Sequence, residues 1–173
     1  MKALFILIFF FVNTPLFNFN TSSDLSNWYV VNDGVMGGIS DSSLVINEEG
    51  HAVFSGLVRL ENNGGFASIR YNFNTISVSE KTELHIKLKG DGKKYQFRVK
   101  NTENTYYSYV FTAKTSGDWE TIKIPLKEMK PQFRGRQLNI NNFDKTSISE
   151  FAILIGNKKK ETFSLLIDTI ELH

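Results

Sequence analysis

Apolar and polar residues alternate with a period of two along most of this chain, and this pattern restricts its fold more than any other feature. The stretch "ELHIKLK" (83–89) alternates leucine and isoleucine with charged or polar residues, and "KYQFRVK" (94–100) does the same with tyrosine, phenylalanine and valine. Successive side chains of a strand point to opposite faces, so alternation indicates strands with one buried and one solvated face. Further strands are expected at 52–60, 66–73, 106–113, 119–126, 149–156 and 163–172.

Turn signals separate these stretches, and no segment of useful length shows the 3.6-residue apolar period of a helix. "NNGG" (62–65) and "GDG" (90–92) are typical of hairpin turns. The chain has 173 residues, which suits one domain. We therefore predict an all-β fold, an antiparallel β-sandwich or jelly roll. The segment 127–147 lacks alternation, and we expect a functional or Ω-type loop there.

The chain begins like an exported protein. One lysine precedes an uninterrupted apolar run at 3–12, which matches a secretory signal peptide and is too short to span a bilayer. We expect residues 1–23 to form the leader, with cleavage near Ser23 and a mature domain at 24–173. An uncleaved membrane anchor is the alternative, because apolar residues continue to Phe19. A mitochondrial transit peptide is disfavoured, since the segment contains no arginine and is not amphipathic. The predicted location is periplasmic or secreted.

Composition argues against several kinds of chemistry. There is no cysteine, so disulfides, thiolate nucleophiles and cysteine-ligated metals are excluded. The three histidines lie far apart and belong to no metal-binding pattern, and no nucleophile elbow or phosphate-binding loop is present. We therefore expect no catalysis, no cofactor and no metal. The formal net charge of +2 argues against a general nucleic-acid footprint.

Two glycine-rich segments go beyond what a scaffold needs. In "DGVMGGIS" (33–40) a tight turn would need the first glycine but not the next two. The segment is either a hairpin or bulge, or a backbone surface left bare for a ligand or a neighbouring loop. In "LENNGGFASIR" (60–70), Phe66, Ser68 and Arg70 share the face opposite the core residues of the strand. That row is either a solvated face or a binding platform.

Charged groups in the C-terminal half suggest two further sites. Arg134 and Arg136 flank a glycine beside Phe133, and such a pair binds a carboxylate or phosphate, or pairs with an acid of the sandwich and holds the loop. Asp168 lies among apolar residues of the last strand and needs a partner if it is buried. We expect an ion pair with Arg70 or Arg134 rather than calcium, because no second acid is adjacent.

Taken together, these segments resemble the complex I intermediate-associated protein 30 family, and the resemblance extends from Trp28 to Leu172. After Trp28 the matching pieces are "NDGVMGGIS", "VFSGLVRLENNGGFASIR", "GDGKKYQFRVK", "YVFTA", "WETIKIPL", "FRGRQL", "ISEFAILIG" and "FSLLIDTIEL". The resemblance implies a galactose-binding-like jelly roll and a protein that assists assembly of respiratory complex I without being an enzyme. The residues to which it draws attention are Asp33, Met36, Gly37, Gly38, Ser40, Glu61, Gly64, Gly65, Phe66, Arg70, Arg134, Gly135 and Arg136.

Two binding functions follow, with an enzyme acting through arginine and carboxylate groups alone as a third. The first is a protein-binding module, an assembly or chaperone-type factor that acts on a membrane complex at the outer face of the membrane. The second is an exported carbohydrate-binding module, because sugar sites stack a ring on an exposed aromatic beside polar groups. It requires Tyr106, Tyr107 or Tyr109 to lie exposed together on a concave face with Gln96 or Arg98.

Overall fold

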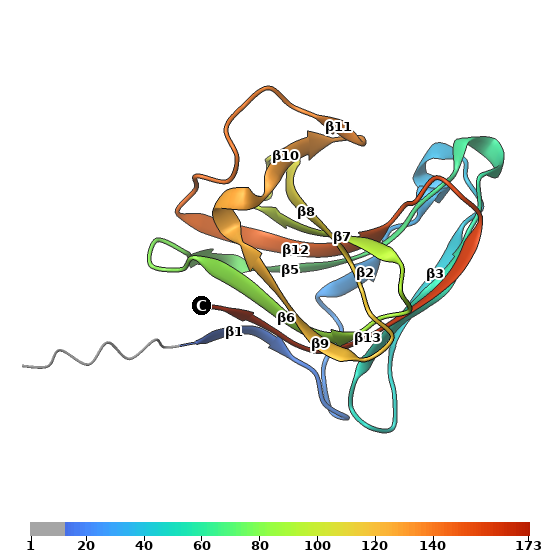
Figure 1. The fold of residues 1–173 in the computed structure, drawn as a ribbon, viewed down its shortest axis with the longest axis horizontal. Coiled ribbons are helices and arrows are strands. Elements are labelled where there is room, and N and C mark those ends of the chain that lie inside the picture. Colours follow the sequence, from blue (N-terminus) through green and yellow to red (C-terminus); the bar gives the residue numbers. More distant parts are fainter. Residues whose placement is uncertain (1–12) are drawn as a thin grey trace, which may run out of the picture.

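The computed structural model describes residues 13–173 and arranges them as two antiparallel β-sheets packed face to face (Figure 1). The apolar run at 3–12 lies outside the described residues. The strands are β1 (Thr14–Asn18), β2 (Trp28–Val30), β3 (Asp41–Ile46), β4 (Ala52–Val58), β5 (Ala67–Ser77), β6 (Glu83–Lys89), β7 (Lys94–Lys100), β8 (Ser108–Lys114), β9 (Trp119–Pro125), β10 (Lys130–Phe133), β11 (Arg136–Gln137), β12 (Ser147–Ile155) and β13 (Glu161–Leu172). Short 3₁₀ helices are η1 (Asp33–Met36), η2 (Glu61–Asn63) and η3 (Leu126–Glu128).

The order of the strands confirms the predicted antiparallel sandwich. Sheet A has the order β3-β4-β13-β6-β9, with β1 also paired to β13. Sheet B has the order β11-β10-β8-β7-β12-β5-β2. Strands that follow one another in the chain often belong to different sheets, which gives the long crossing connections of a jelly roll.

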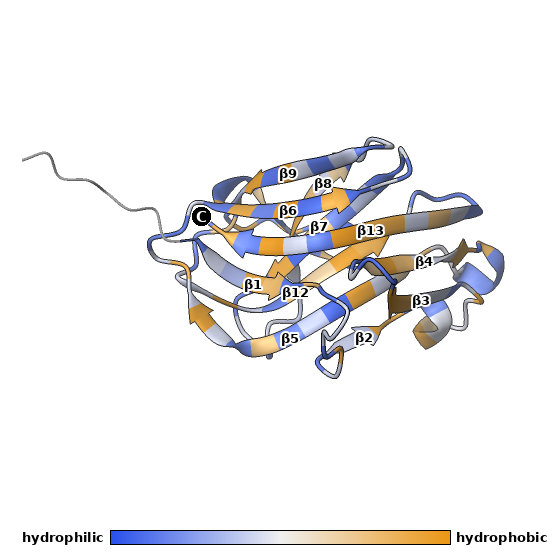
Figure 2. Ribbon diagram, turned by 90° about the horizontal axis from the view of Figure 1, so that it is seen from below, coloured by the Kyte–Doolittle hydropathy of each residue, from blue (hydrophilic) through white to orange (hydrophobic). Residues whose placement is uncertain are grey.

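Alternation places the core between the sheets. Figure 2 shows hydrophobic and hydrophilic residues succeeding one another along the strands of sheet A. On β6 and β7 the residues predicted to point inward are all buried, namely Leu84, Ile86, Leu88, Tyr95, Phe97 and Val99. Each such side chain contributes roughly 1.5–3 kcal/mol by leaving water. Truncation of Phe97 to alanine would therefore cost about 3–5 kcal/mol.

The predicted hairpins at 62–65 and 90–92 are wrong. The strands that flank each turn belong to different sheets, since β4 and β6 lie in sheet A while β5 and β7 lie in sheet B. At Gly90 a Cβ atom would overlap the side chain of Thr115, so this glycine is required by close packing at the crossing. Turn residues specify that the chain reverses, but they do not specify which sheet receives the next strand.

The segment 127–147 is more ordered than its sequence suggests. It contains β10 and β11, and β10 extends the edge of sheet B by pairing with β8. Met129 and Phe143 are buried and attach the segment to the core. Strands this short contain too few residues for alternation to be recognised.

Part of the predicted leader belongs to the sandwich. Strand β1 pairs with one edge of β13, and β6 pairs with the opposite edge of the same strand. Phe17 and Phe19 pack against Trp28 with ring centroids 5.5 and 5.4 Å away, and Phe19 is buried. Cleavage near Ser23 would remove this strand and both rings. Whether the leader is cleaved there stays a prediction.

Within residues 13–173, no helix has the length and apolar character needed to cross a membrane.

Candidate functional site

The carboxylate of Asp33 joins the two glycine-rich segments. Its Oδ1 accepts a hydrogen bond from the backbone N–H of Ser40 (2.9 Å), and its Oδ2 accepts from the N–H groups of Gly65 (2.6 Å) and Phe66 (3.2 Å). The Ser40 hydroxyl also donates to Oδ2. Burial raises the pKa of Asp33, but these hydrogen bonds outweigh it and hold the pKa below its usual value. A buried carboxylate is thus kept ionised without an ion pair to any residue in the described part of the chain.

The close approach of the Asp33 side chain explains the surplus glycines. A Cβ atom at Gly38 would overlap the Asp33 carboxylate, and one at Gly64 would lie 2.8 Å from Asp33 Oδ2. Gly37 ends η1 in the left-handed region, with φ of +89°, which glycine adopts without steric cost. Of the alternatives for "DGVMGGIS", the structure shows a backbone left bare for a neighbouring loop.

An exposed apolar surface lies above this network. Val35 (74% exposed), Met36 (52%), Ile39 (43%) and Leu60 (44%) form what we call the apolar tip. In Figure 1, η1 and η2 lie together at one end of the sandwich. Sequence reasoning singled out Met36 and missed the other three. The sequence did contain a signal, namely the consecutive apolar residues Val35 and Met36 inside a glycine-rich turn. So short a turn cannot bury both of their side chains.

Arg70 and Arg98 meet on the outer face of sheet B, the face turned away from sheet A. Both residues pair with Ala152 of β12, Arg70 from β5 and Arg98 from β7. Arg98 donates from Nε (3.2 Å) and Nη2 (2.6 Å) to Oε1 of Gln96. Burial lowers the pKa of Arg98 to about 10, and the charge of Arg70 adds to that effect. Two guanidinium groups therefore flank one small residue.

Glu150 lies beside these arginines, and the sequence analysis did not identify it as a site residue. It is buried, its Oε2 lies 3.6 Å from Lys100 Nζ, and it accepts a hydrogen bond from the Tyr29 hydroxyl (3.4 Å). The pairing of β12 with β5 is irregular between Ile148 and Glu150, and the alternation along β12 shifts there, since Ile148 and Phe151 are both in the core. That shift hides the acid from pattern-based reasoning.

The remaining predicted site residues lie elsewhere. Glu61 is exposed and pairs with Nη2 of Arg59 (3.1 Å). Arg134 and Arg136 lie at the β10–β11 turn, where the Arg134 guanidinium is 5.3 Å from the centre of the Phe133 ring. Within residues 13–173 neither arginine forms an ion pair, so the loop is not held in the way that one alternative required. The predicted residues thus form three groups rather than one cleft.

The ion pair predicted for Asp168 exists, but with other partners. Its Oδ2 lies 2.7 Å from Lys87 Nζ and its Oδ1 lies 3.5 Å from His51 Nδ1. Neither Arg70 nor Arg134, the two expected partners, pairs with Asp168. Lys87 reaches Asp168 instead because β6 and β13 are neighbours, a fact that only the topology supplies.

The tyrosines do not form the exposed row that a sugar site would need. Tyr106 is exposed, Tyr107 is half-buried and Tyr109 is buried. Their rings make successive edge-to-face contacts, with centroids 5.2 and 5.4 Å apart, and lead from the surface into the core. Tyr106 also contacts Phe133 at 5.2 Å.

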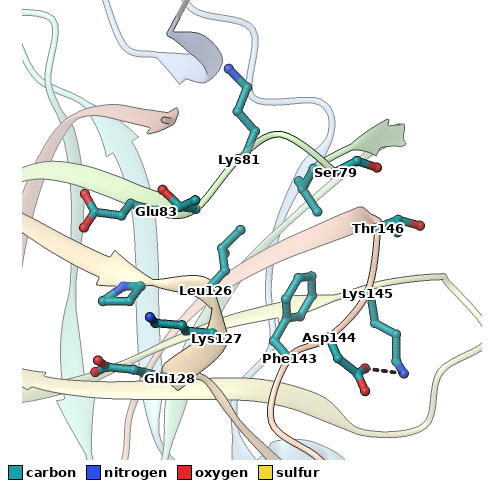
Figure 3. Close-up of a pocket in the computed structure, with 13 residues that line it drawn as sticks. Ser79, Lys81, Glu83, Leu126, Lys127, Glu128, Phe143, Asp144, Lys145 and Thr146 are labelled. Carbon is teal, nitrogen blue, oxygen red and sulfur yellow. Dashed lines mark ion pairs between the residues drawn. The ribbon is translucent and has the colours of Figure 1, made fainter. Parts of the chain in front are cut away.

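A cavity lies away from all predicted site residues. It has a volume of about 640 Å³ and lies between the β5–β6 loop, η3 and the segment before β12 (Figure 3). Charged side chains of both signs line it, and Asp144 pairs with Lys145 at 2.6 Å. In the described part of the chain, no three His, Asp or Glu side chains gather in a way that could hold a metal ion.

Solved structures that share this fold include carbohydrate-binding modules. The family 11 module of a Clostridium thermocellum cellulase is 17% identical, with a TM-score of 0.69 over 93% of this chain and 94% of that one. A family 29 module gives 12% identity and a TM-score of 0.54 over 94% and 91%. These likenesses establish the galactose-binding-like jelly roll.

Sequence comparison gives the family. An uncharacterized protein of Schizosaccharomyces pombe is 28% identical over 172 residues, covering 83% of this chain and 78% of that protein. The model of the family described as Complex I intermediate-associated protein 30 matches residues 17–167. The match includes both glycine-rich segments, Arg70 and Arg98, and the β10–β11 turn. This chain belongs to the complex I intermediate-associated protein 30 family.

Proposed function

We propose that the chain is a non-catalytic module that binds a protein partner through its apolar tip. Val35, Met36, Ile39 and Leu60 are all exposed at one end of the molecule, and this observation carries the proposal. Exposed apolar patches of this kind are typical of protein interaction sites. The Asp33 network holds the backbone beneath the tip, so little conformational entropy is lost when the tip is covered.

The family name supports an assembly or chaperone-type role on a membrane complex. Because we expect the chain to be exported, the partner that we propose lies outside the cytoplasm. Such a factor needs no catalytic group, because it acts by covering and releasing surface on an incomplete complex. Binding of moderate strength suits that role better than permanent association.

Photo-crosslinking tests this proposal. A photoreactive residue replaces Val35, and crosslinking is carried out in membranes of the native host. We expect one defined partner, whose crosslink disappears when Met36→Asp is added. The control is Val45→Asp, which places the same charge at an exposed apolar position of β3. Crosslinks that survive Met36→Asp, or that spread over many proteins, would contradict the proposal.

Glycan binding is a second candidate, favoured by the polar outer face of sheet B. Gln96, Asn72, Gln132 and Thr112 lie on that face, and amide and hydroxyl groups are the usual partners of sugar hydroxyls. The family 11 module, whose fold this chain shares, was solved in complex with a β-1,3-1,4-mixed-linked tetrasaccharide. Binding by this chain is tested together with the ligand class inferred below.

A further inference from the structure

Charge is divided unequally between the two sheets. Glu150 is the only acidic residue in the strands of sheet B, whereas acids occur in β3, β6, β9 and β13 of sheet A. The cations on the outer face of sheet B are Arg70, Lys94, Arg98, Lys100, Lys114 and Lys130. The chain as a whole has a formal net charge of only +2. Near-neutrality therefore conceals one strongly basic surface, which we call the basic face.

Like charges on this face lie directly beside one another. Lys94 and Lys114 are opposite partners in the β7–β8 register, and both are exposed. Arg70 and Arg98 are not direct partners, but they lie on either side of Ala152, one from each strand next to β12. Like charges opposite one another destabilise a sheet. In residues 13–173 none of these four forms an ion pair with an acid, so an anionic ligand would relieve the repulsion.

The surroundings of the arginines favour a single extended chain over a flat or stacking ligand. In Figure 1 β10 and β11 stand above the layer formed by β5, β12 and β7, and the helices η1 and η2 stand beyond its right-hand end. A planar lipid surface would meet these projections first. Of the exposed aromatic rings, Tyr29 lies opposite Arg70 in the β2–β5 register, whereas Tyr106 and Phe133 lie apart from the arginines near β8 and β10. The small residue Ala152 separates the two arginines. Nucleic acid strands need rings on which successive bases stack.

The chemistry of the central groups matches sugar carboxylates. A guanidinium group binds a carboxylate through two parallel hydrogen bonds, and Arg70 and Arg98 present two such groups. Gln96 holds Arg98 in place and keeps an amide N–H₂ group that can donate to a hydroxyl. Asn72 lies next to Glu150 in the β5–β12 register and supplies a second amide. Lys94 and Lys114 add attraction for further carboxylates along the same chain.

We propose that the basic face binds an acidic oligosaccharide, a chain of uronic-acid residues whose carboxylates contact Arg70 and Arg98. The inference rests on the proposed glycan-binding function and narrows it to one ligand class. The ligand lies across β5, β12 and β7, with Lys94 and Lys114 at the end near the β6–β7 connection. The apolar tip remains free for a protein partner.

Isothermal titration at about 150 mM salt tests the ligand class, because this salt concentration screens weak surface attraction. The probes are oligogalacturonate, a neutral mixed-linked β-glucan oligosaccharide, an oligothymidylate of similar charge, and phosphatidylglycerol vesicles. We expect binding of oligogalacturonate alone. If the neutral β-glucan oligosaccharide binds and oligogalacturonate does not, the inference is overturned but the proposed glycan binding stands. If neither sugar binds, both proposals are contradicted. Equal or tighter binding of the oligothymidylate or the vesicles also overturns it.

Matched variants then locate the site. Lys94→Gln with Lys114→Gln, and separately Arg70→Gln, should each weaken oligogalacturonate binding by roughly tenfold or more, since each loses charge-assisted contacts. Lys89→Gln with Lys123→Gln is the control, because it removes the same charge from exposed positions of sheet A. A control that weakens binding as much as the sheet B variants would place the ligand elsewhere and overturn the assignment.

Discussion

Replacement of Asp33 by asparagine isolates the role of the buried carboxylate. Asparagine has the same shape, but one oxygen becomes an N–H₂ group and the charge is lost. If the amide oxygen faces Gly65 and Phe66, the N–H₂ group faces the backbone N–H of Ser40, which then has no acceptor. In the reverse orientation both Gly65 and Phe66 lose their acceptor. The first orientation is therefore favoured, and it loses one backbone hydrogen bond together with the charge assistance of the others.

The magnitude follows from those losses. A hydrogen bond to a charged group contributes roughly 1.5–3 kcal/mol, and a buried N–H without an acceptor costs about 1–3 kcal/mol. Part of this loss of stability is offset, because asparagine buries no charge. We expect the free energy of unfolding to fall by about 2–4 kcal/mol, a large part of a typical 5–15 kcal/mol. The variant should fold but be clearly less stable.

Urea unfolding followed by the fluorescence of buried Trp28 measures this change. Asp41→Asn, on the exposed start of β3, is the control and should change stability by less than about 0.5 kcal/mol. The folded pKa of Asp33 lies below its usual value, so its contribution is complete above the unfolded pKa and is lost as pH falls through the folded pKa. The deficit of Asp33→Asn should therefore be full at neutral pH and shrink in acid. A deficit below about 1 kcal/mol, or one independent of pH, would refute this account.

Two further predictions concern packing, and a third measurement concerns the first residue of the mature protein. Gly38→Ala should lower the unfolding midpoint in urea because its Cβ overlaps the Asp33 carboxylate, while Gly34→Ala, with nothing within 4 Å of its Cβ, should be neutral or slightly stabilising. Phe19→Ala should cost about 3–5 kcal/mol in the same assay if β1 is kept in the mature protein. Mass spectrometry of the exported protein gives its first residue directly, and a start at residue 24 would mean that the functional fold lacks β1.

Strand positions could be predicted wherever each face of a strand keeps the same environment along the whole strand. The ranges 83–89 and 94–100 were predicted to the residue, since the core lies on one side and water on the other along their whole length. β10 and β11 were not predicted, because they are short and lie at an edge of the sheet. The irregular pairing of β5 and β12 near Glu150 breaks the period of two, and no sequence signal marks it.

The candidate site was predictable as a set of residues but not as an arrangement. Glycine-rich segments with unneeded glycines indicate close backbone approach, and Gly38 and Gly64 confirm this. Their shared contact, the Asp33 carboxylate, could not be inferred, because hydrogen bonds between segments thirty residues apart leave no local pattern. Arg70 and Arg98 share one site only because β5 and β7 both pair with β12, which comes far later in the chain.

By itself, the sequence determined that this protein is an antiparallel β-sandwich of the complex I intermediate-associated protein 30 family, because the period of a strand is recorded in neighbouring residues. Only the tertiary structure decided that Asp33 is a buried anchor, that an apolar tip stands above it, and that the cations gather on sheet B while acids gather on sheet A. Total charge is a property of composition. Its segregation depends on which strands become neighbours, and long-range strand pairing is not encoded within any single segment.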